Sequence, residues 1–179
     1  AAMTMRDADR YFAEYERAIH AIGKASAGRG VYAGPGISIK LSALHPRYVR
    51  AQAQRVMDEL LPRVRDLALL ASTYDIGFNI DAEEADRLEL SLDVIEALAF
   101  DPALSGWHGL GLVVQAYGKR CPFVIDWIVN LAERSGHRIM VRLVKGAYWD
   151  SEIKRAQVDG LPDFPVFTRK PHTDVSYIA

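Results

Sequence analysis

The stretch IGFNIDAEEADRLELSLDVIEALAF, residues 76–100, decides the fold class. It opens with a short apolar run, Ile76–Ile80, that is followed at once by Asp81. From Asp86 to Phe100 the apolar residues recur three or four positions apart, which is the period of a helix with one buried face. That face consists of Leu88, Leu92, Ile95 and Ala99. The stretch therefore predicts one strand followed by one helix that covers it.

The same strand–helix unit recurs on both sides of this stretch. Further apolar runs lie at Ile37–Leu44, Leu110–Val114 and Ile139–Val144, and helical patterns follow them at Arg50–Tyr74, Pro122–Arg134 and Ser151–Val158. Pro62 lies inside the first of these helices and predicts a kink or a break. Short apolar strands alternating with helices are typical of a parallel α/β fold, either a doubly wound sheet or a (β/α)8 barrel. The first strand is not followed by a Gly-rich dinucleotide fingerprint, which favours the barrel.

The remaining segments frame these units. A helix is predicted from Ala8 to Ala25, and the Gly-rich segment Ala27–Gly36 has the composition of a linker. Gly160–Pro171 is predicted to be a loop, and Thr173-Asp174 resembles the N-cap of a last helix that the chain end cuts. We therefore divide the chain into residues 1–36, an N-terminal helix and linker, and residues 37–179, the strand–helix units.

The composition is that of an ordinary soluble globular protein. Of 179 residues, 50% are hydrophobic and 25% charged, and the formal net charge is -1. These values exclude a disordered tail, a collagen-like fibre and a disulfide scaffold, and they argue against a broadly basic nucleic-acid binder. A single cysteine, Cys121, favours a reduced, cytoplasmic setting. No apolar run approaches the ~18 residues of a membrane span, and no signal peptide opens the chain.

Polar residues stand at the same end of each predicted strand. Lys40, Asp81, Gln115 and Arg142 lie at or near the carboxyl ends of the four runs. In a (β/α)8 barrel the active site lies at that end, so these residues predict one shared site. The alternative is a core ion-pair network among Lys40, Asp81 and Arg142 without chemistry, because buried charges must be paired.

The types of these residues restrict the chemical class of ligand that the site could bind. Lys40, Arg142 and Lys145 supply positive charge, and the Gln115 amide can both donate and accept hydrogen bonds. Tyr148 and Trp149 offer flat faces beside a small Gly-Ala pair that allows close approach to the backbone. A planar heterocycle with a phosphate tail, together with a small carboxylate substrate, suits this set. The residues themselves do not separate a flavin from pyridoxal phosphate or a Schiff-base lysine.

Other candidate sites carry weaker signals. The acidic run Asp81–Asp86 contains no His, and Glu84 and Asp86 suit the first turn of a helix better than a metal site. His45 is expected to have a loop or capping role, and Cys121 a structural one. We therefore predict no metal.

Four long motifs resemble the proline dehydrogenase domain of the proline utilization A family, which are bacterial bifunctional flavoenzymes. The motifs are Ile37-Ser-Ile-Lys-Leu-Ser-Ala-Leu-His-Pro-Arg-Tyr48, Asn79-Ile-Asp-Ala-Glu-Glu-Ala-Asp-Arg87, Val114-Gln-Ala-Tyr117 and Arg142-Leu-Val-Lys-Gly-Ala-Tyr-Trp-Asp-Ser-Glu152. The resemblance implies a distorted (β/α)8 TIM-like barrel, of which this chain covers about the first four β/α units, with non-covalent FAD. It implies oxidation of L-proline to Δ1-pyrroline-5-carboxylate, with hydride passing to flavin N5 and electrons to a membrane quinone. It also implies a cytoplasmic enzyme that is peripheral on the inner face of the cell membrane.

The resemblance assigns roles to individual residues. Lys40 corresponds to a lysine that contacts the substrate carboxylate, Asp81 to an aspartate near substrate and flavin, and Arg142 to an arginine near N5, with Tyr148 beside the substrate. The implied cofactor-binding residues are Asp81, Ala82, Val113, Gln115, Arg142, Val144, Lys145, Gly146, Ala147, Trp149, Thr168 and Lys170. An arginine pair and a glutamate, which in the family follow the eighth strand, have no counterpart here. The expected site is therefore incomplete, and DNA binding is not supported by this segment.

Two other interpretations stay open. Lys40 and Lys145 at strand ends would also suit a lysine Schiff-base aldolase on the same barrel. A non-catalytic assembly fragment that pairs with a missing half of the barrel is the second alternative, because four strands cannot close such a barrel.

Overall fold

A computed structural model describes all residues 1–179 and contains one parallel sheet. Its strands are β1 (Ile37–Ile39), β2 (Phe78–Ile80), β3 (Leu110–Gln115) and β4 (Met140–Val144), and their spatial order is β1-β2-β3-β4. All three strand pairs are parallel, with Ile37 opposite Phe78, Phe78 opposite Leu110, and Gly111 opposite Met140. The four predicted strands and their parallel arrangement are therefore confirmed, and their carboxyl ends meet at one edge of the sheet.

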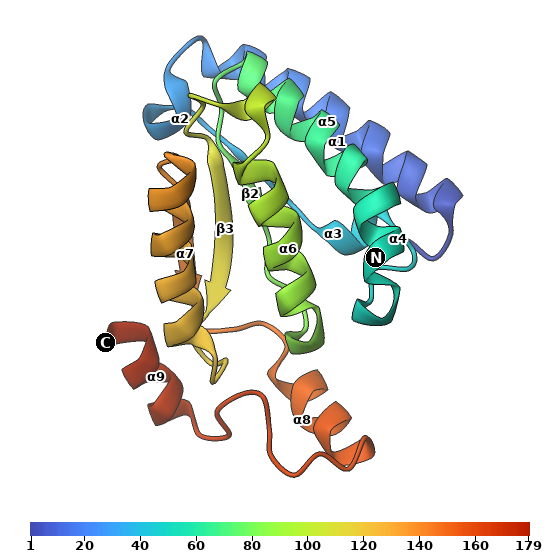
Figure 1. The fold of residues 1–179 in the computed structure, drawn as a ribbon, viewed down its shortest axis with the longest axis vertical. Helices are drawn as coiled ribbons and strands as arrows, with labels where there is room; N and C mark the ends of the chain where they lie inside the picture. Colours follow the sequence, from blue (N-terminus) through green and yellow to red (C-terminus); the bar gives the residue numbers. More distant parts are fainter.

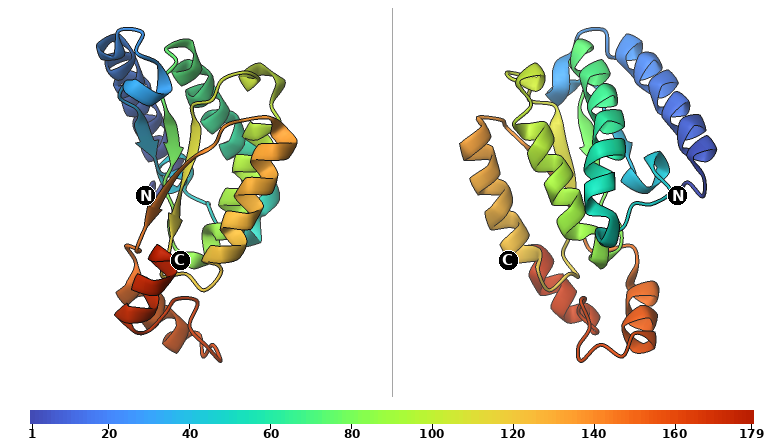
Figure 2. Two further views of the ribbon diagram at one scale, coloured as in Figure 1. Left: turned by 90° about the vertical axis from the view of Figure 1, so that its left-hand side faces the viewer. Right: turned by 45° about the vertical axis from the view of Figure 1, so that its right-hand side comes forward.

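Helices connect the strands and cover one face of the sheet. α5 (Leu61–Thr73), α6 (Leu88–Ala99) and α7 (Cys121–Ser135) follow β1, β2 and β3, and they lie side by side in the right-hand view of Figure 2. α8 (Trp149–Val158) and α9 (Lys170–Ile178) follow β4 and lie beyond the carboxyl ends of the strands (Figure 1). The shorter elements are α2 (Gly30–Ala33), α3 (Leu41–Leu44), η1 (Arg50–Gln52), α4 (Ala53–Arg55), η2 (Val56–Leu60), η3 (Ala85–Arg87) and η4 (Pro102–Leu104).

The core lies between the sheet and these helices. Alternate strand residues such as Ile39, Phe78 and Leu112 are buried there, because successive side chains of a strand point to opposite faces. The opposite face carries Ser38, Asn79 and Arg142, which are more exposed. One covered face and one open face are what a barrel segment requires, since the open face is the interior of the barrel.

The N-terminal helix α1 (Met5–Ser26) shares this core. Thr4 and Asp7 form a reciprocal capping box at its start, which explains why the helix begins three residues before the predicted Ala8. Ile19 is fully buried in the main hydrophobic cluster, and Gly23 lets the Tyr74 ring of the loop after α5 approach the helix closely. The predicted division of the chain at residue 36 stays a prediction.

Two short helices differ from the sequence-based expectation. The apolar run Ile37–Leu44 is a strand only to Ile39, because Leu41–Leu44 turns inward as α3 and all four of its residues are buried. The predicted linker contains α2, where Gly30 at φ 76° reverses the chain and Val31 packs against the core.

The predicted kink or break at Pro62 takes the form of a local change in hydrogen bonding within a segment that stays helical from Ala53 to Thr73. α5 begins at Leu61 with Pro62 in its first turn, and the preceding five residues, Val56–Leu60, form a π-helical turn. Because proline has no N–H, it cannot donate the helical bond of that position, and the Leu61 N–H reaches back to the Val56 carbonyl instead.

The last helix begins earlier than expected. α9 starts at Lys170 after Arg169, so the prediction of Thr173-Asp174 as its N-cap is wrong. Pro171 suits the first turn of a helix, and Thr173 is buried within the helix. None of the helices combines the length and the apolar character that a membrane span requires.

Candidate active site

The carboxyl ends of the four strands enclose a hollow of about 300 Å3, here called the strand-end hollow. Its lining comes from the residues that end the strands and from the segment after β4: Lys40, Asp81, Ala82, Val113, Gln115, Arg142, Val144, Lys145, Gly146, Ala147 and Tyr148. Volumes of 300–1,000 Å3 are typical of small-molecule sites, so the strand-end hollow is large enough for a ligand.

An ion pair crosses the strand-end hollow. The guanidinium of Arg142 donates to the carboxylate of Asp81, from two strands that are not neighbours in the sheet. The backbone N–H of Asp81 is held by the Ile39 carbonyl at 2.8 Å, which fixes the residue at the strand end. About half of the Arg142 side chain remains exposed (54%), so its other N–H groups face the hollow and are free for an anion.

Lys40 is the second cation of the strand-end hollow, and it forms no ion pair with Asp81. Its backbone N–H donates to the hydroxyl of Tyr15 on α1, 3.1 Å away. Interaction with the neighbouring Tyr148 raises the pKa of the Lys40 ammonium, and burial raises the pKa of the Tyr148 hydroxyl. At neutral pH the Lys40 ammonium is therefore charged and the Tyr148 hydroxyl is protonated. Both groups can donate hydrogen bonds to a carboxylate.

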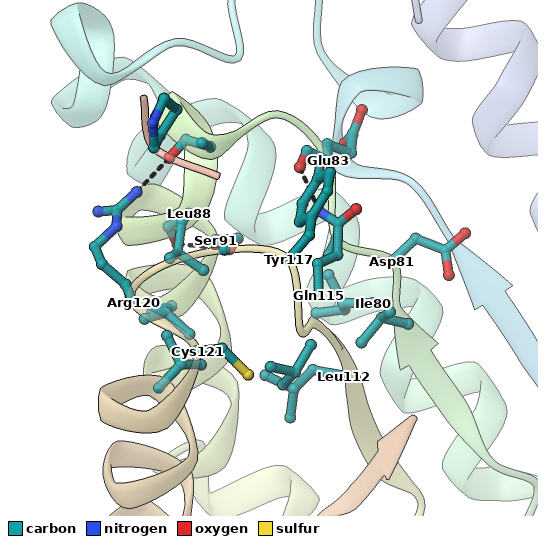
Figure 3. A pocket seen from close by; sticks show the side chains of 18 of the residues that line it. Ile80, Asp81, Glu83, Leu88, Ser91, Leu112, Gln115, Tyr117, Arg120 and Cys121 are labelled. Carbon is teal, nitrogen blue, oxygen red and sulfur yellow. Dashed lines mark hydrogen bonds between the residues drawn. The ribbon is translucent and has the colours of Figure 1, made fainter. Parts of the chain in front are cut away.

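Gln115 links the two segments that border the strand-end hollow. Its Nε2 donates to the Glu83 carbonyl at 2.9 Å (Figure 3). Its Oε1 accepts from the Ala147 N–H at 3.0 Å. A primary amide has two donors and two acceptor positions, so one of each remains for a ligand. The orientation of the amide is fixed because a flipped side chain would lose both bonds.

Gly146 shapes the floor between β4 and α8. Its φ is 142°, and an added Cβ would lie 2.4 Å from the Tyr117 ring. Only glycine fits this backbone and this contact, which is why a small residue follows Lys145.

A second hollow of about 440 Å3 adjoins the first and is here called the outer hollow. Its lining residues are Tyr117, Lys145, Gly146, Trp149, Thr168, Lys170 and Thr173, of which Lys145 and Gly146 also line the strand-end hollow. The ammonium groups of Lys145 and Lys170 both lie 2.6 Å from Asp174 on α9, and this carboxylate raises the pKa of Lys145. Two cations therefore flank the outer hollow.

The structure thus brings every predicted site residue into one of two connected hollows. Eleven line the strand-end hollow, and Trp149, Thr168 and Lys170 line the outer hollow. Their roles stay predictions. The sequence-based reasoning missed Tyr15, Glu83 and Glu152, which contact these residues or their segments. Tyr15 carries the signal of an apolar helix face, and only tertiary contacts distinguish it from a core residue.

The remaining candidates lie outside both hollows. His45 is buried, its Nε2 lies 2.8 Å from Glu59, and its Nδ1 accepts from the Arg47 N–H, so it orders the loop after α3. Cys121 is buried and lines a narrow, mostly apolar cavity of about 60 Å3 behind Gln115, together with Ile80 and Leu112 (Figure 3). No group of three or more His, Cys, Asp or Glu side chains is arranged to hold a metal ion.

The two lysines do not have the environment of a Schiff-base lysine. Such a lysine must be deprotonated to attack a carbonyl, and proteins lower its pKa by burial or by a neighbouring cation. The pKa of Lys40 is raised by Tyr148, and that of Lys145 by Asp174. Both amines are held protonated, which argues against the aldolase interpretation.

Comparisons with known proteins give the family. The family described as Proline dehydrogenase matches residues 1–179. The "Bifunctional protein PutA" of Klebsiella aerogenes is 69% identical over 179 residues, and that of Rhizobium meliloti is 74% identical over 175 residues. These matches cover 100% and 98% of this chain and 14% of each relative, so the chain spans about one seventh of their length.

Solved structures give the same result. A crystal structure of a mutant of Bradyrhizobium japonicum Proline Utilization A (PutA) matches 99% of this chain and 18% of its own, with a TM-score of 0.97 and 56% identity. A PutA structure from Bdellovibrio bacteriovorus, described as inactivated by N-propargylglycine, matches 99% of this chain and 20% of its own, with a TM-score of 0.90 and 26% identity. The parallel α/β fold predicted from the sequence is therefore confirmed as part of a TIM-barrel-like domain. The chain belongs to the proline dehydrogenase family.

Proposed function

We propose that this chain forms the first part of a proline dehydrogenase site that oxidises L-proline to Δ1-pyrroline-5-carboxylate with bound FAD and passes the electrons to a quinone. The observation that carries the proposal is the strand-end hollow, where Lys40, Arg142 and Gln115 converge in a chain of this family. Two cations and an amide around one opening suit a small carboxylate and the polar edge of a heterocycle.

The residues present fit FAD. A dinucleotide needs a long cleft, and the two hollows of about 300 and 440 Å3 join at Lys145 and Gly146. Gln115 and Arg142 would hold the ring system, and Lys145, Thr168 and Lys170 would hold the phosphate-bearing end. When bound, FAD supplies the acceptor for the hydride that leaves the proline ring.

The chain's own residues bind and orient the substrate. Lys40 attracts the proline carboxylate with its charge, and Tyr148 donates its hydroxyl hydrogen beside it. Arg142 keeps positive charge at the edge of the strand-end hollow, where negative charge develops during reduction, and Asp81 fixes the guanidinium in that place. The proline amine must lose its proton before an iminium can form, and Tyr148 is not the acceptor because burial keeps it protonated.

Lysine alone is a weak carboxylate clamp. A planar arginine binds a carboxylate with two parallel hydrogen bonds, whereas an ammonium acts as a point charge. We therefore propose that a longer chain completes the substrate site with further cations. We also propose a cytoplasmic protein that meets its quinone at the inner face of the cell membrane.

The test is a chain extended through all eight strands. We expect it to purify with a yellow flavin spectrum and to reduce a soluble quinone when L-proline is added. A flavin-free protein without proline turnover would contradict the proposal. Borohydride trapping with a carbonyl substrate tests the aldolase alternative, which predicts a covalent lysine adduct. We expect no adduct.

A further inference from the structure

The segment Asp81–Ala85, which leads from β2 to η3, is held by hydrogen bonds with residues of three other elements. Ser42 of α3 donates its N–H to the Glu83 carboxylate at 3.0 Å, and Gln115 of β3 donates to the Glu83 carbonyl. At the far end, Glu152 of α8 accepts from the Ala85 N–H at 2.6 Å. The segment also carries Asp81 and Ala82 into the strand-end hollow, so whatever fixes the segment fixes one wall of that hollow.

Ala85 has both of its backbone polar groups bonded by charged side chains. Besides the bond from its N–H to Glu152, its carbonyl accepts from the Arg120 guanidinium at 2.6 Å. η3 begins at Ala85, and the preceding Glu84 makes no capping bond of its own. Glu152 therefore caps this helix from another element, where a negative charge is also favoured by the helix dipole.

Burial of the Glu152 carboxylate is energetically unfavourable. Only 3% of the residue is exposed, no Lys, Arg or His lies within ion-pair distance of its carboxylate, and burial raises its pKa. Exposed ion pairs of the same helix, such as Arg155 with Asp86 at 2.7 Å, would hold α8 on this side at lower cost. A buried carboxylate aimed at one backbone N–H gives instead a short, directional link between α8 and the β2–η3 segment.

That link reaches the strand-end hollow through the first turn of α8. The Glu152 N–H donates to the Tyr148 carbonyl at 2.9 Å, so the two residues are one helical turn apart. Gln115 joins the same two segments on the inner side through Glu83 and Ala147. Two bridges, one inside and one outside, therefore set the separation between Tyr148 and Asp81 across the hollow.

We propose that Glu152 is a positioning residue of the proline site, which acts by holding Tyr148 at a fixed distance from Asp81 and Lys40. The proposal rests on the proposed function for its kinetic consequence, while the link itself is a property of the chain. Glu152 touches neither hollow that would hold substrate or cofactor, so it acts only through α8 and the β2–η3 segment.

The test uses the full-length parent protein with its flavin and three variants. Glu152→Ala removes the acceptor, Glu152→Gln keeps a carbonyl oxygen as acceptor, and Ala85→Pro removes the donor. Proline suits position 85, because it would be the first residue of η3 and Glu84 already has the extended backbone (φ -63°, ψ 152°) that precedes proline. Asp150→Ala is the matched control, since Asp150 is an exposed acid of the same helical turn without an ion pair.

We expect Glu152→Ala and Ala85→Pro to raise the KM for L-proline about tenfold with kcat changed less than about threefold, because the binding geometry loosens while the flavin stays in place. Amide hydrogen exchange over residues 81–87 should quicken about tenfold in Glu152→Ala. Glu152→Gln should restore both KM and protection, and Asp150→Ala should change neither.

Three results would overturn the positioning role. One is a wild-type KM in both Glu152→Ala and Ala85→Pro. Another is a loss of flavin, kcat and melting temperature together in Glu152→Ala without rescue by Glu152→Gln, which is a structural defect only. If Glu152→Ala does not fold, Ala85→Pro and Glu152→Gln decide, and equal KM values for these two variants count against the proposal. A wild-type protein that does not oxidise L-proline would instead overturn the proposed function, and the exchange measurement would still test the link.

Discussion

At the scale of single residues, the ion pair between Arg142 and Asp81 separates the two interpretations of the strand ends. A core network without chemistry would pair Lys40, Asp81 and Arg142 together, but the ion pair in the structure joins Arg142 and Asp81 alone. Lys40 takes no part in the pair. The arrangement leaves a guanidinium with spare donors at the edge of a hollow, which is the requirement of an anion site.

Replacing Arg142 by Met tests its role in the extended chain. Without the guanidinium, negative charge that develops on the bound flavin loses a preorganised partner, and Asp81 adds an unpaired carboxylate nearby. We expect kcat/KM for L-proline to fall about 100-fold and the flavin reduction potential to become more negative. Steady-state kinetics and potentiometry measure the two effects. Arg138→Met, at the opposite end of β4, is the control, and an unchanged potential in Arg142→Met would contradict the role.

Gly146 gives a second prediction, which concerns stability. An alanine there would combine a φ of 142° with a Cβ placed 2.4 Å from the Tyr117 ring. We expect Gly146→Ala to lower the free energy of unfolding by about 3 kcal/mol or more, as measured by urea titration. Gly160→Ala is the matched control, because Gly160 also has a positive φ (63°) but nothing lies within 4 Å of its Cβ position. Its cost should be about 1 kcal/mol, and equal losses in both variants would refute the steric argument.

At the scale of elements, the sequence predicts what depends on periodicity and misses what depends on tertiary contacts. The apolar faces of α5, α6 and α7 and the four strand positions follow from spacing alone. The turn at Leu41–Leu44 could not be predicted, because its residues are as apolar as a strand and only its burial against the core decides its shape. The start of α9 could be predicted from Pro171, which is a stronger signal than the Thr173-Asp174 pair.

The candidate site shows the same division. Their positions at or near the carboxyl ends of parallel strands place Lys40, Asp81, Gln115 and Arg142 at one edge of the sheet, and this needs no structure. The contacts of Glu83 and Glu152 could not be predicted from the sequence. An acidic residue near a helix start shows the same local pattern whether it caps its own helix or bonds to another element. Their partners, Ser42 and Ala85, lie 41 and 67 residues away in sequence.

The junction between α5 and η4 allows a prediction of pH dependence. Asp101 is the N-cap of η4, where its side chain accepts from the Ala103 N–H. It also pairs with Arg65 of α5, and this pairing lowers the pKa of Asp101 below its usual value of 3.8. A lowered pKa in the folded state means that the contribution is complete above the unfolded value and is lost as the pH falls through the folded one. The pair is partly exposed, so its contribution is about 1 kcal/mol.

We therefore expect Asp101→Asn to destabilise the fold by about 1 kcal/mol at pH 6, and we expect this difference to shrink at an acid pH where Asp101 becomes protonated in the folded state. The asparagine oxygen can still accept from Ala103, so only the charge is removed. Urea unfolding of the extended chain at both pH values measures the difference, with Asp126→Asn on the exposed face of α7 as control. A deficit of the same size at both pH values would show that the ion pair is not responsible.

At the scale of the whole molecule, β4 is an edge strand of the sheet. It bonds to β3 on one side, and its other side has no partner strand. Val141 on this strand is 43% exposed, and a hollow of about 740 Å3 between α7 and α9 is lined mainly by apolar side chains, including Leu143 and Phe167. An open parallel edge beside exposed apolar surface is a template for association with another chain.

The last prediction is that the 179-residue chain associates with itself through this edge when it is expressed alone, and that a charge at position 141 reduces the association. A lysine on an edge strand opposes pairing because a second strand would bury the ammonium, whereas the single chain leaves it in water. Sedimentation velocity over a range of concentrations should show oligomers for the wild-type chain and a shift toward monomer for Val141→Lys. Val129→Lys adds the same charge at an equally exposed valine of α7 (54%) and should leave the oligomers unchanged. A monomeric wild-type chain, or an equal effect of both lysines, would contradict association through β4.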